Sequence, residues 1–277
     1  MTGLSPSVEE VQALAFHLGG AAPASRLVPA EVAVAITYGG STQAVLMASP
    51  DDLEDFAVGF SLTEGIIDGI AEIEAIERID SELGIEMRLI LARPREERLA
   101  ARRRSMAGPV GCGLCGIESL EAATRTLRPV SADITFTPAQ ILAAMAALAP
   151  LQRINAATHA VHAAAFWRQE RGIALLREDI GRHNALDKLA GAIARDGLAP
   201  GDGAVLLTSR VSVEMVQKTA VIGAPVIVAV SAPSALAIHT ANEAGITLVA
   251  VARADGFEVF THPRRILMNQ GATRDVA

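Results

Sequence analysis

Alternating runs of hydrophobic and polar residues predict a mostly stranded first region of the chain. Residues 31–37 (EVAVAIT) and 43–49 (QAVLMAS) predict two strands, and the Gly-Gly pair at 39–40 can form the tight turn of a hairpin between them. Residues 71–92 predict two further short strands around the polar stretch DSELG. Residues 1–30 are rich in Ala, Pro and Ser without clear periodicity. We therefore expect them to form a loose arm.

Two helices are predicted from their capping signals. Residues 49–65 place apolar side chains on one helical face, with Ser49 as a candidate N-cap, Pro50 at the first helical position and Gly65 after the end. Thr137-Pro138-Ala139-Gln140 resembles a capping box at the start of an alanine-rich helix.

The second half of the chain has the pattern of an α/β fold. Residues 162–167 and 173–179 predict adjacent strands, and residues 182–197 predict a helix with a glycine stop. Buried strands then begin at Ala204, Pro225 and Ile246, with helical stretches between them and a final strand at 257–261. Repeated strand–helix units of this length predict parallel strands with right-handed crossovers.

We accordingly expect an α/β protein with three parts. Residues 1–30 form the arm, residues 31–130 form a smaller α+β lobe, and residues 131–277 form an α/β lobe with a mixed, largely parallel sheet. A glycine-rich loop near 108–118 belongs to the smaller lobe.

Composition excludes several classes of protein. Hydrophobic residues make up 51% of the 277 residues, which is too many for a chain that is mainly disordered. Aromatic residues make up 3%, which argues against single-stranded nucleic-acid binding by stacking, and a net charge of −7 argues against general duplex binding. The chain has no apolar run long enough to span a membrane and no signal-peptide pattern. We expect a cytoplasmic protein that binds neither nucleic acid nor membrane.

Polar residues repeatedly follow the predicted strands of the second half, where parallel sheets bind ligands. Helix capping accounts for Ser212 and Ser231. It does not account for Arg182, His183 and Arg210, which are not capping residues. Their positions predict a pocket for an anionic or nucleotide-like ligand.

The only two cysteines, Cys112 and Cys115, form a CxxC pair among four glycines. A structural zinc site would need ligands from elsewhere, and a thioredoxin-like dithiol would normally lie in a βαβ context. Inert cysteines would not need such a glycine-rich setting. The remaining interpretation is a reactive thiolate, whose pKa nearby positive charge would lower. The six arginines of residues 93–104 could supply that charge, or could simply form a solvated surface.

Six motifs together resemble the FdhD family of sulfur-carrier accessory proteins for formate dehydrogenase. In chain order they are PDDLEDFAVGFSLTEGII, GCGLCG, EDIGRHNALDK, SRVSVEMVQK, VSAPSALAI and GITLVAVAR. The resemblance covers roughly residues 30–267. It implies a cytidine deaminase-like fold for the second lobe and a homodimer. The deaminase zinc signature is missing, so we expect no metal site and no deamination.

The resemblance also implies a function as a sulfurtransferase. A cysteine desulfurase would pass sulfur to Cys112 as a persulfide, assisted by Cys115. The sulfur would then go to the molybdenum bis(molybdopterin guanine dinucleotide) cofactor, bound as a substrate, before its insertion into formate dehydrogenase. The cofactor contacts would fall on Val251, Ala252, Arg253, Ala254, Asp255 and Gly256, with Arg182, His183 and Arg210 as further candidates. A guanine nucleotide should then mimic the ligand.

Two other functions use the same residues. A thiol–disulfide oxidoreductase would reduce a model disulfide with its CxxC pair and would need no desulfurase. A non-catalytic chaperone would only shield the cofactor, and would keep its function with both cysteines replaced.

Overall fold

The computed structural model describes residues 6–97 and 127–267. Two compact units emerge, and both are assembled from separate stretches of the chain. The first unit comprises Met1–Thr126, Gln152–Ala164 and Leu176–Leu198, and the second comprises Leu127–Leu151, Ala165–Leu175 and Ala199–Ala277. The mixed α/β class expected from the sequence is confirmed. The units differ from the two consecutive lobes that the sequence predicts, because each takes in part of the chain between residues 152 and 198.

The first unit contains a four-stranded sheet of order β4-β3-β6-β5. The predicted hairpin of residues 31–49 is confirmed, with Gly39 and Gly40 at φ of 54° and 73° in its turn. Apolar side chains of this sheet, including Ile36, Met87 and Leu89, form a core with Phe56 of helix α1. The elements are β3 (Val32–Tyr38), β4 (Ser41–Ala48), α1 (Leu53–Thr63), β5 (Ile73–Ser81) and β6 (Gly84–Leu91).

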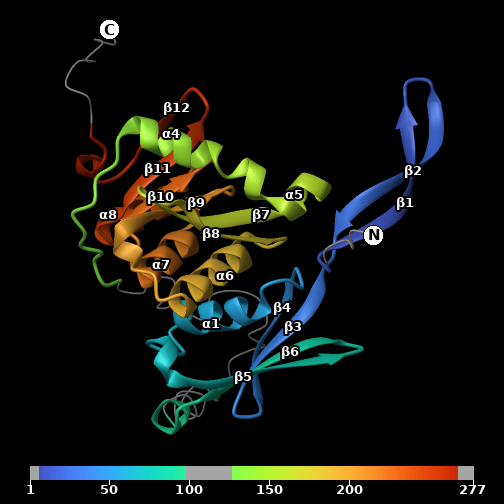
Figure 1. Ribbon diagram of the computed structural model, residues 1–277, viewed down its shortest axis with the longest axis horizontal. Coiled ribbons are helices and arrows are strands. Elements are labelled where there is room, and N and C mark those ends of the chain that lie inside the picture. The colour runs from blue at the N-terminus through green and yellow to red at the C-terminus, as the bar shows by residue number, and fades with distance from the viewer. Residues whose placement is uncertain (1–5, 98–126, 268–277) are drawn as a thin grey trace. The chain divides into compact units, whose positions relative to one another are not determined.

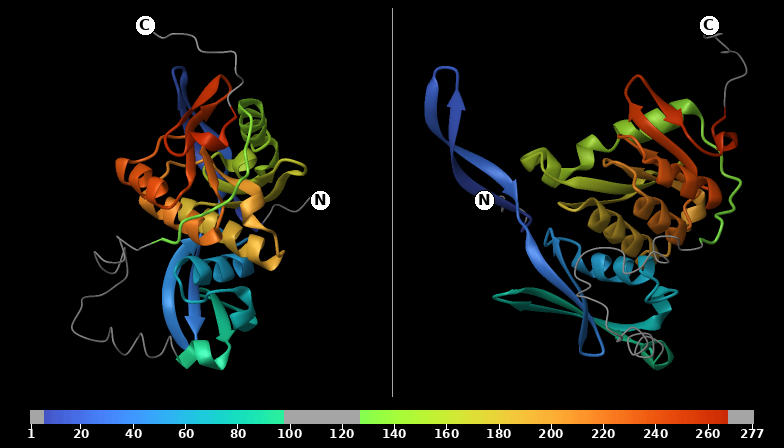
Figure 2. Two further views of the ribbon diagram at one scale, coloured as in Figure 1. Left: turned by 90° about the vertical axis from the view of Figure 1, so that its left-hand side faces the viewer. Right: turned by 180° about the vertical axis from the view of Figure 1, so that it is seen from behind.

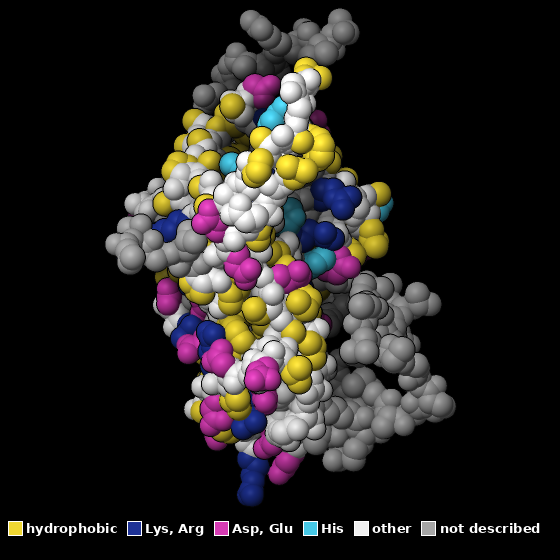
Figure 3. Space-filling model, turned by 90° about the vertical axis from the view of Figure 1, so that its right-hand side faces the viewer, with side chains coloured by type: hydrophobic (Ala, Val, Ile, Leu, Met, Phe, Trp, Pro, Cys, Tyr) yellow, Lys and Arg dark blue, Asp and Glu magenta, His cyan; other side chains and the backbone are white. Residues whose placement is uncertain are grey.

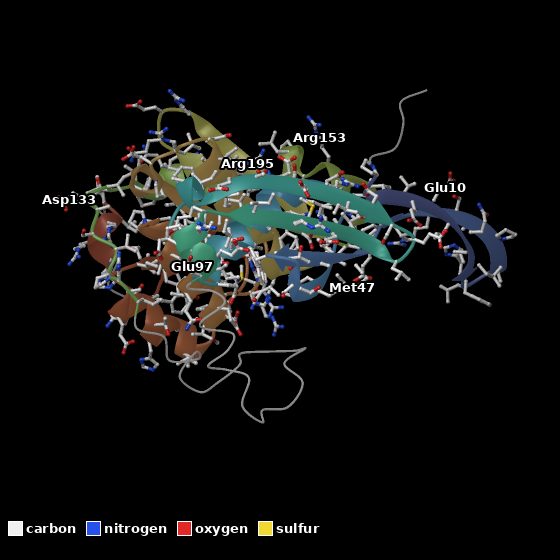
Figure 4. The ribbon with its side chains drawn as sticks, turned by 90° about the horizontal axis from the view of Figure 1, so that it is seen from below. Glu10, Met47, Glu97, Asp133, Arg153 and Arg195 are labelled. Carbon is white, nitrogen blue, oxygen red and sulfur yellow. The ribbon has the colours of Figure 1, made fainter. Side chains whose placement is uncertain are left out.

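The other face of this sheet carries a chain of polar contacts. Thr37 donates to Glu86 at 2.8 Å, and Arg88 pairs with Glu86 at 3.1 Å and with Glu77 at 3.5 Å. These cross-strand pairs occupy a face that is only partly buried. Met47, labelled on β4 in Figure 4, is half exposed on the same sheet.

Helix α1 begins later than the sequence predicts. Its N-cap is Asp52, in the left-handed conformation, and not Ser49. Ser49 is instead fully buried, where its N–H donates to Asp179 at 3.0 Å and its Oγ accepts from the N–H of Ile180 at 3.2 Å. Local capping rules select Ser49 as the N-cap, but its tertiary contacts with Asp179 and Ile180 keep it out of the helix. Gly65 follows the end of the helix at φ 67°, as predicted.

Helices α1 and α6 (Arg182–Arg195) of the first unit lie side by side (Figure 1). Two glycines allow the close approach. A Cβ atom at Gly59 would lie 1.7 Å from the carbonyl oxygen of Asp187, and one at Gly191 would lie 1.9 Å from that of Asp55. The contact also carries charge, because the buried carboxylate of Asp55 pairs with Arg195 at 2.5 Å.

Residues 6–30 do not form the loose arm that the sequence predicts for this part of the chain. Strands β1 (Val8–His17) and β2 (Gly20–Pro29) form a regular antiparallel hairpin with ten residue pairs (Figure 1). The short helix α5 (Arg153–Thr158) packs against both strands. Cross-strand backbone pairing, which composition does not reveal, has overridden the low strand propensity of Ala, Pro and Ser. Leu14 and Phe16 are exposed near the tip, where Figure 3 shows hydrophobic side chains gathered.

The second unit contains the predicted parallel strands. β9, β10 and β11 pair in parallel, and β12 adds antiparallel to β11. They form one side of a six-stranded sheet of order β12-β11-β10-β9-β7-β8, whose last two strands contribute residues to both units. These strands are β7 (His162–Arg168), β8 (Gly172–Asp179), β9 (Gly203–Leu207), β10 (Val226–Ala229), β11 (Thr247–Arg253) and β12 (Gly256–Val259).

Helices cover both faces of these parallel strands. α4 (Pro138–Ala146) lies on one face, and α7 (Val213–Ile222) and α8 (Ala235–Glu243) lie on the other (Figure 1; Figure 2). The capping box predicted for α4 is confirmed, since Thr137 Oγ1 accepts from the N–H of Gln140 at 3.3 Å. Within the described ranges, no helix is both long and apolar enough to cross a membrane.

Candidate functional site

The cysteine pair lies outside the described residues. Cys112 and Cys115 fall within residues 98–126, as do four of the six arginines of the predicted basic stretch. Their proposed chemistry therefore stays a prediction from the sequence.

Arg95, one of the two described arginines of that stretch, is used by the fold. Its guanidinium donates to the carbonyl oxygens of Ile66 and Gly65, the latter at 2.9 Å, and pairs with Asp68 at 3.0 Å. These contacts tie the segment after β6 to the loop after α1. Arg95 accordingly serves the local structure.

In the second unit, the loops after the three parallel strands are joined into one edge by backbone hydrogen bonds. Three bonds join β9 and the loop after it to the loop after β10, and the fourth joins that loop to β11. They run from Val230 N to Leu207 O at 3.0 Å, Val211 N to Ala232 O at 3.3 Å, Ser234 N to Val211 O at 3.0 Å and Val251 N to Ser231 O at 3.4 Å. Such an edge is where parallel sheets place their ligands.

Two predicted basic residues, Arg210 and Arg253, lie at this edge and are exposed. Ser212 precedes α7, but its hydroxyl donates to Glu214 at 2.6 Å and caps no backbone N–H. Helix α8 is capped by Ser234, which differs from the capping role that the sequence indicates for Ser231. Ser212 thus occupies the predicted N-cap position of α7 without a side-chain capping bond, whereas the prediction for Ser231 is wrong because Ser234 caps α8.

The stretch implied to contact the cofactor forms the end of β11 and the turn into β12. Ala252 is buried, whereas Arg253, Ala254 and Asp255 are exposed. Gly256 opens β12 and pairs with Arg253 across the turn. Val251 has an unusual backbone conformation, with φ of 53°.

Two further predicted residues, Arg182 and His183, lie at the start of α6 in the first unit, next to a buried polar cluster around Asp179. Asp179 is fully buried and accepts hydrogen bonds from Ser49 N at 3.0 Å, Gly181 N at 2.8 Å and Asn184 Nδ2 at 3.0 Å. Its charge is balanced by Lys188, also fully buried, at 2.8 Å. Asp179 thus holds together the loop that leads into α6.

Glu178 also has a structural role. Its carboxylate accepts from the backbone N–H groups of Ile154 at 2.9 Å and Asn155 at 2.8 Å, at the start of α5. A carboxylate at that position satisfies free backbone donors at the helix N-terminus. Glu178, Asp179 and Asn184 are therefore engaged within the protein, which leaves Arg182 and His183 as ligand candidates.

Arg182 is the residue of this group with unused binding capacity. Its Nε is buried and has no hydrogen-bond partner among the described residues. Burial lowers the pKa of neighbouring His162, and the positive charge of Arg182 lowers it further. The buried, unpartnered Nε–H of Arg182 is a donor that an anionic ligand could accept from.

The predicted cofactor residues thus fall into two groups, one in each unit. Arg182 and His183 belong to the first unit, and Arg210 and residues 251–256 belong to the second. That all of them contact one ligand stays a prediction. Within residues 6–97 and 127–267, no group of three or more His, Cys, Asp or Glu side chains is placed to hold a metal ion.

Sequence reasoning missed Lys188 as an individual residue. It lies on the buried face of α6, four positions after Asn184, and both side chains contact Asp179. A lysine among the apolar positions of a helix is the signal that could have identified it, because buried lysines require a partner.

The FdhD/NarQ family model matches residues 29–267, which leaves out most of the β1–β2 hairpin. A protein named sulfur carrier protein FdhD from Agrobacterium fabrum is 52% identical over 269 residues, covering 97% of this chain and 99% of that protein. A protein of the same name from Brucella abortus is 55% identical over 259 residues, covering 93% of this chain and 96% of that one.

A solved structure is also similar. It is described as a formate dehydrogenase accessory protein from Desulfotalea psychrophila, with a TM-score of 0.76 and 27% sequence identity. The similarity covers 95% of this chain and all of that one.

Proposed function

The chain belongs to the FdhD/NarQ family, and on this premise we propose that it is a sulfur carrier for formate dehydrogenase maturation. It takes sulfur from a cysteine desulfurase and passes it to the molybdenum bis(molybdopterin guanine dinucleotide) cofactor, its bound substrate. The sulfurated cofactor is then inserted into formate dehydrogenase. We place this activity in the cytoplasm and assign it to a homodimer.

The observation that carries this proposal is the match to relatives that are named sulfur carriers. Two such proteins are more than half identical to this chain over nearly its whole length. The CxxC pair adds a chemical reason, because it offers the thiolate that sulfur transfer needs.

The loading step is a displacement at sulfur. The Cys112 thiolate attacks the outer sulfur of the desulfurase persulfide, forming a new S–S bond while the desulfurase S–S bond breaks. The desulfurase cysteine leaves as a thiolate, so the step needs no outside oxidant or reductant. Cys115 is the assisting thiol of this proposal.

The nucleotide end of the cofactor is proposed to bind basic side chains at the sheet edge of the second unit. Arg210 and Arg253 are exposed there, and guanidinium groups bind phosphates with paired hydrogen bonds. Arg182, with its unpartnered Nε, and His183 are the candidate contacts from the first unit.

Formate dehydrogenase maturation in cells that lack the endogenous carrier tests the role of each thiol. Cys112→Ala should abolish maturation, whereas Cys115→Ala should reduce it less. A variant with both cysteines replaced that still supports maturation would contradict sulfur transfer and favour a non-catalytic chaperone. Reduction of a model disulfide without a desulfurase would instead favour a thiol–disulfide oxidoreductase.

Nucleotide binding tests the cofactor site separately. GDP should bind and raise the melting temperature by mass action, and Arg253→Ala should weaken this binding without preventing sulfur loading. ADP is the control ligand. Equal binding of ADP and GDP would reduce the site to a general anion site.

A further inference from the structure

The outer half of the β1–β2 hairpin exposes large apolar side chains. Leu14, Phe16 and Leu18 are 57%, 75% and 113% exposed, respectively. Every residue from 12 to 23 is exposed apart from Ala15, which is half-buried. One apolar side chain at a surface is ordinary, but three within five residues form a patch of the kind that binds a partner. A two-stranded hairpin is also only marginally stable by itself. Both observations indicate that another element packs against this half of the hairpin.

The positions of two prolines show which backbone groups of the hairpin point outward. The backbone groups of successive residues in an antiparallel strand point alternately toward the neighbouring strand and away from it. Pro23 and Pro29 of β2 both lie within the ladder of paired residues. Proline has no N–H, so it is tolerated where that group would point away from the neighbouring strand. The odd-numbered residues of β2 and their even-numbered partners on β1 therefore direct their backbone groups outward.

The outer edge of β1 carries a complete row of backbone donors and acceptors. Its outward positions are residues 8, 10, 12, 14 and 16, and none of them is proline. The outward positions of β2 include Pro23 and Pro29, which interrupt its row of donors. Within the described ranges, β1 pairs with no strand other than β2. Such an edge is a template for a further strand, whereas prolines protect the edge of β2.

The row on β1 is complementary to a second copy of itself. In an antiparallel pairing about a two-fold axis at Leu14, this residue faces the partner's Leu14, and Phe16 faces the partner's Gln12. Glu10, the one charged residue of the row, then faces the partner's Leu18 and lies far from the partner's Glu10. No like charges are opposed, and the apolar side chains of both copies gather on one face. An axis at Gln12 would instead place Glu10 against Leu14, which is less favourable.

We propose that the outer edge of β1 is a homodimer interface, in which the β1 strands of two copies pair antiparallel about Leu14. The two hairpins then form one four-stranded sheet, which uses the unpaired backbone groups and covers the exposed apolar side chains. The inference rests on the homodimer of the proposed function and adds the surface that forms it. The FdhD/NarQ family model begins at residue 29, so this surface lies outside the part of the chain that the family model matches.

Leu14→Lys tests the interface through charge. The substitution places two ammonium groups opposite each other at the two-fold axis and removes an apolar pair. We expect the dissociation constant of the dimer, measured by sedimentation over a series of concentrations, to rise roughly ten-fold or more. Ala21→Lys is the matched control, because it adds the same charge to the exposed partner of Phe16 on β2. That strand stays at the outside of the four-stranded sheet, so the dissociation constant should not change.

Cysteine cross-linking tests the register. Leu14→Cys is made in a chain whose Cys112 and Cys115 are replaced by serine, so that the new thiol is the only one. Hydrogen-bonded partners in antiparallel strands have Cα atoms about 5.5 Å apart, within the range that a disulfide spans. Mild oxidation should therefore give a disulfide-linked dimer. Glu10→Cys in the same background is the control, because in this register the two residues 10 lie about 27 Å apart along the strands and should not be linked.

The outcomes separate this inference from the proposed homodimer. If the original chain dimerises equally well with Leu14→Lys, the β1 surface is wrong and the homodimer must use another interface. A disulfide formed by Glu10→Cys and not by Leu14→Cys would contradict the pairing about Leu14. If the original chain stays monomeric over the whole series of concentrations, the homodimer of the proposed function and this inference both fail. Sulfur loading is measured independently of both.

Discussion

At the scale of single residues, the buried pair of Lys188 and Asp179 is the most consequential charge arrangement in the first unit. Both side chains are fully buried, and Asp179 connects Ser49, Gly181 and Asn184. A buried carboxylate that loses its cation is left with an uncompensated charge. The polar residues around the start of α6 thus contribute to folding before they contribute to any ligand.

Lys188→Met should therefore destabilise the protein by about 3 kcal/mol, measured by urea unfolding. The matched control is Arg78→Met, which breaks the exposed pair of Arg78 and Asp80 and should change stability little. Equal stability of the two variants would show that the buried pair is not a significant stabilising contact.

His162 predicts a specific pH dependence of stability. Burial and Arg182 lower its pKa below the ordinary value of 6.5 in the folded protein. The unfolded chain therefore binds a proton at this residue before the folded protein does. The contribution of His162 to stability is present above the unfolded pKa and is lost as the pH falls through the folded pKa.

Melting temperatures of the original chain and of His162→Asn, compared from pH 7.5 down to pH 5, measure this effect. The variant should lose less stability than the original chain over this interval. His17→Asn, at an exposed position of the hairpin, is the control. Parallel curves for the original chain and His162→Asn would contradict the assigned environment of His162.

At the scale of elements, the close packing of α1 against α6 depends on glycine. A methyl group at Gly59 would lie 1.7 Å from the carbonyl oxygen of Asp187, so the helices would have to separate. Gly59→Ala should cost about 1–3 kcal/mol or more in the free energy of unfolding, despite the better helix propensity of alanine. Gly69→Ala, at a site with open space, is the control and should be nearly neutral. Equal free energies of unfolding for the two variants would show that this helix contact tolerates a side chain.

The sequence predicts well those elements that have a clear local signal. The parallel strands, the turn at Gly39 and Gly40 and the capping box at Thr137 all follow from periodicity, turn chemistry or capping. The capping prediction for Ser49 is wrong because Asp179, far away in the sequence, binds Ser49 away from the helix. The sequence does not predict the β1–β2 hairpin, because backbone hydrogen bonds hold its strands together and need no hydrophobic pattern in the sequence.

At the scale of the whole molecule, the sequence predicts the edge of the sheet but not its detailed geometry. Residues that follow parallel strands meet at one edge by topology, so the proximity of the loops bearing Arg210 and Val251 could be anticipated. The register shift of β11 at residues 250–253 could not, since it depends on pairing with β12. The division into two units, each built from separate stretches of the chain, could not be predicted either, because it depends on contacts between residues far apart in the sequence.

Loading of sulfur and binding of cofactor depend, in this proposal, on different residues. Loading needs an accessible thiolate at Cys112, and binding needs fixed positive charge at residues such as Arg253. Arg253→Ala should consequently accept sulfur from a desulfurase at normal yield and yet support little formate dehydrogenase maturation. Cys112→Ala should bind GDP normally and accept no sulfur. Full maturation with Arg253→Ala would show that the cofactor site lies elsewhere.

The most direct measurement is the intact mass of the protein after incubation with a cysteine desulfurase and cysteine. We predict an adduct of one sulfur atom that reducing agents remove and that peptide mapping places on Cys112. The adduct should be absent from Cys112→Ala. An original chain that gains no sulfur would contradict the carrier function. An adduct of normal yield on Cys112→Ala, mapped to Cys115, would contradict the assignment of the acceptor.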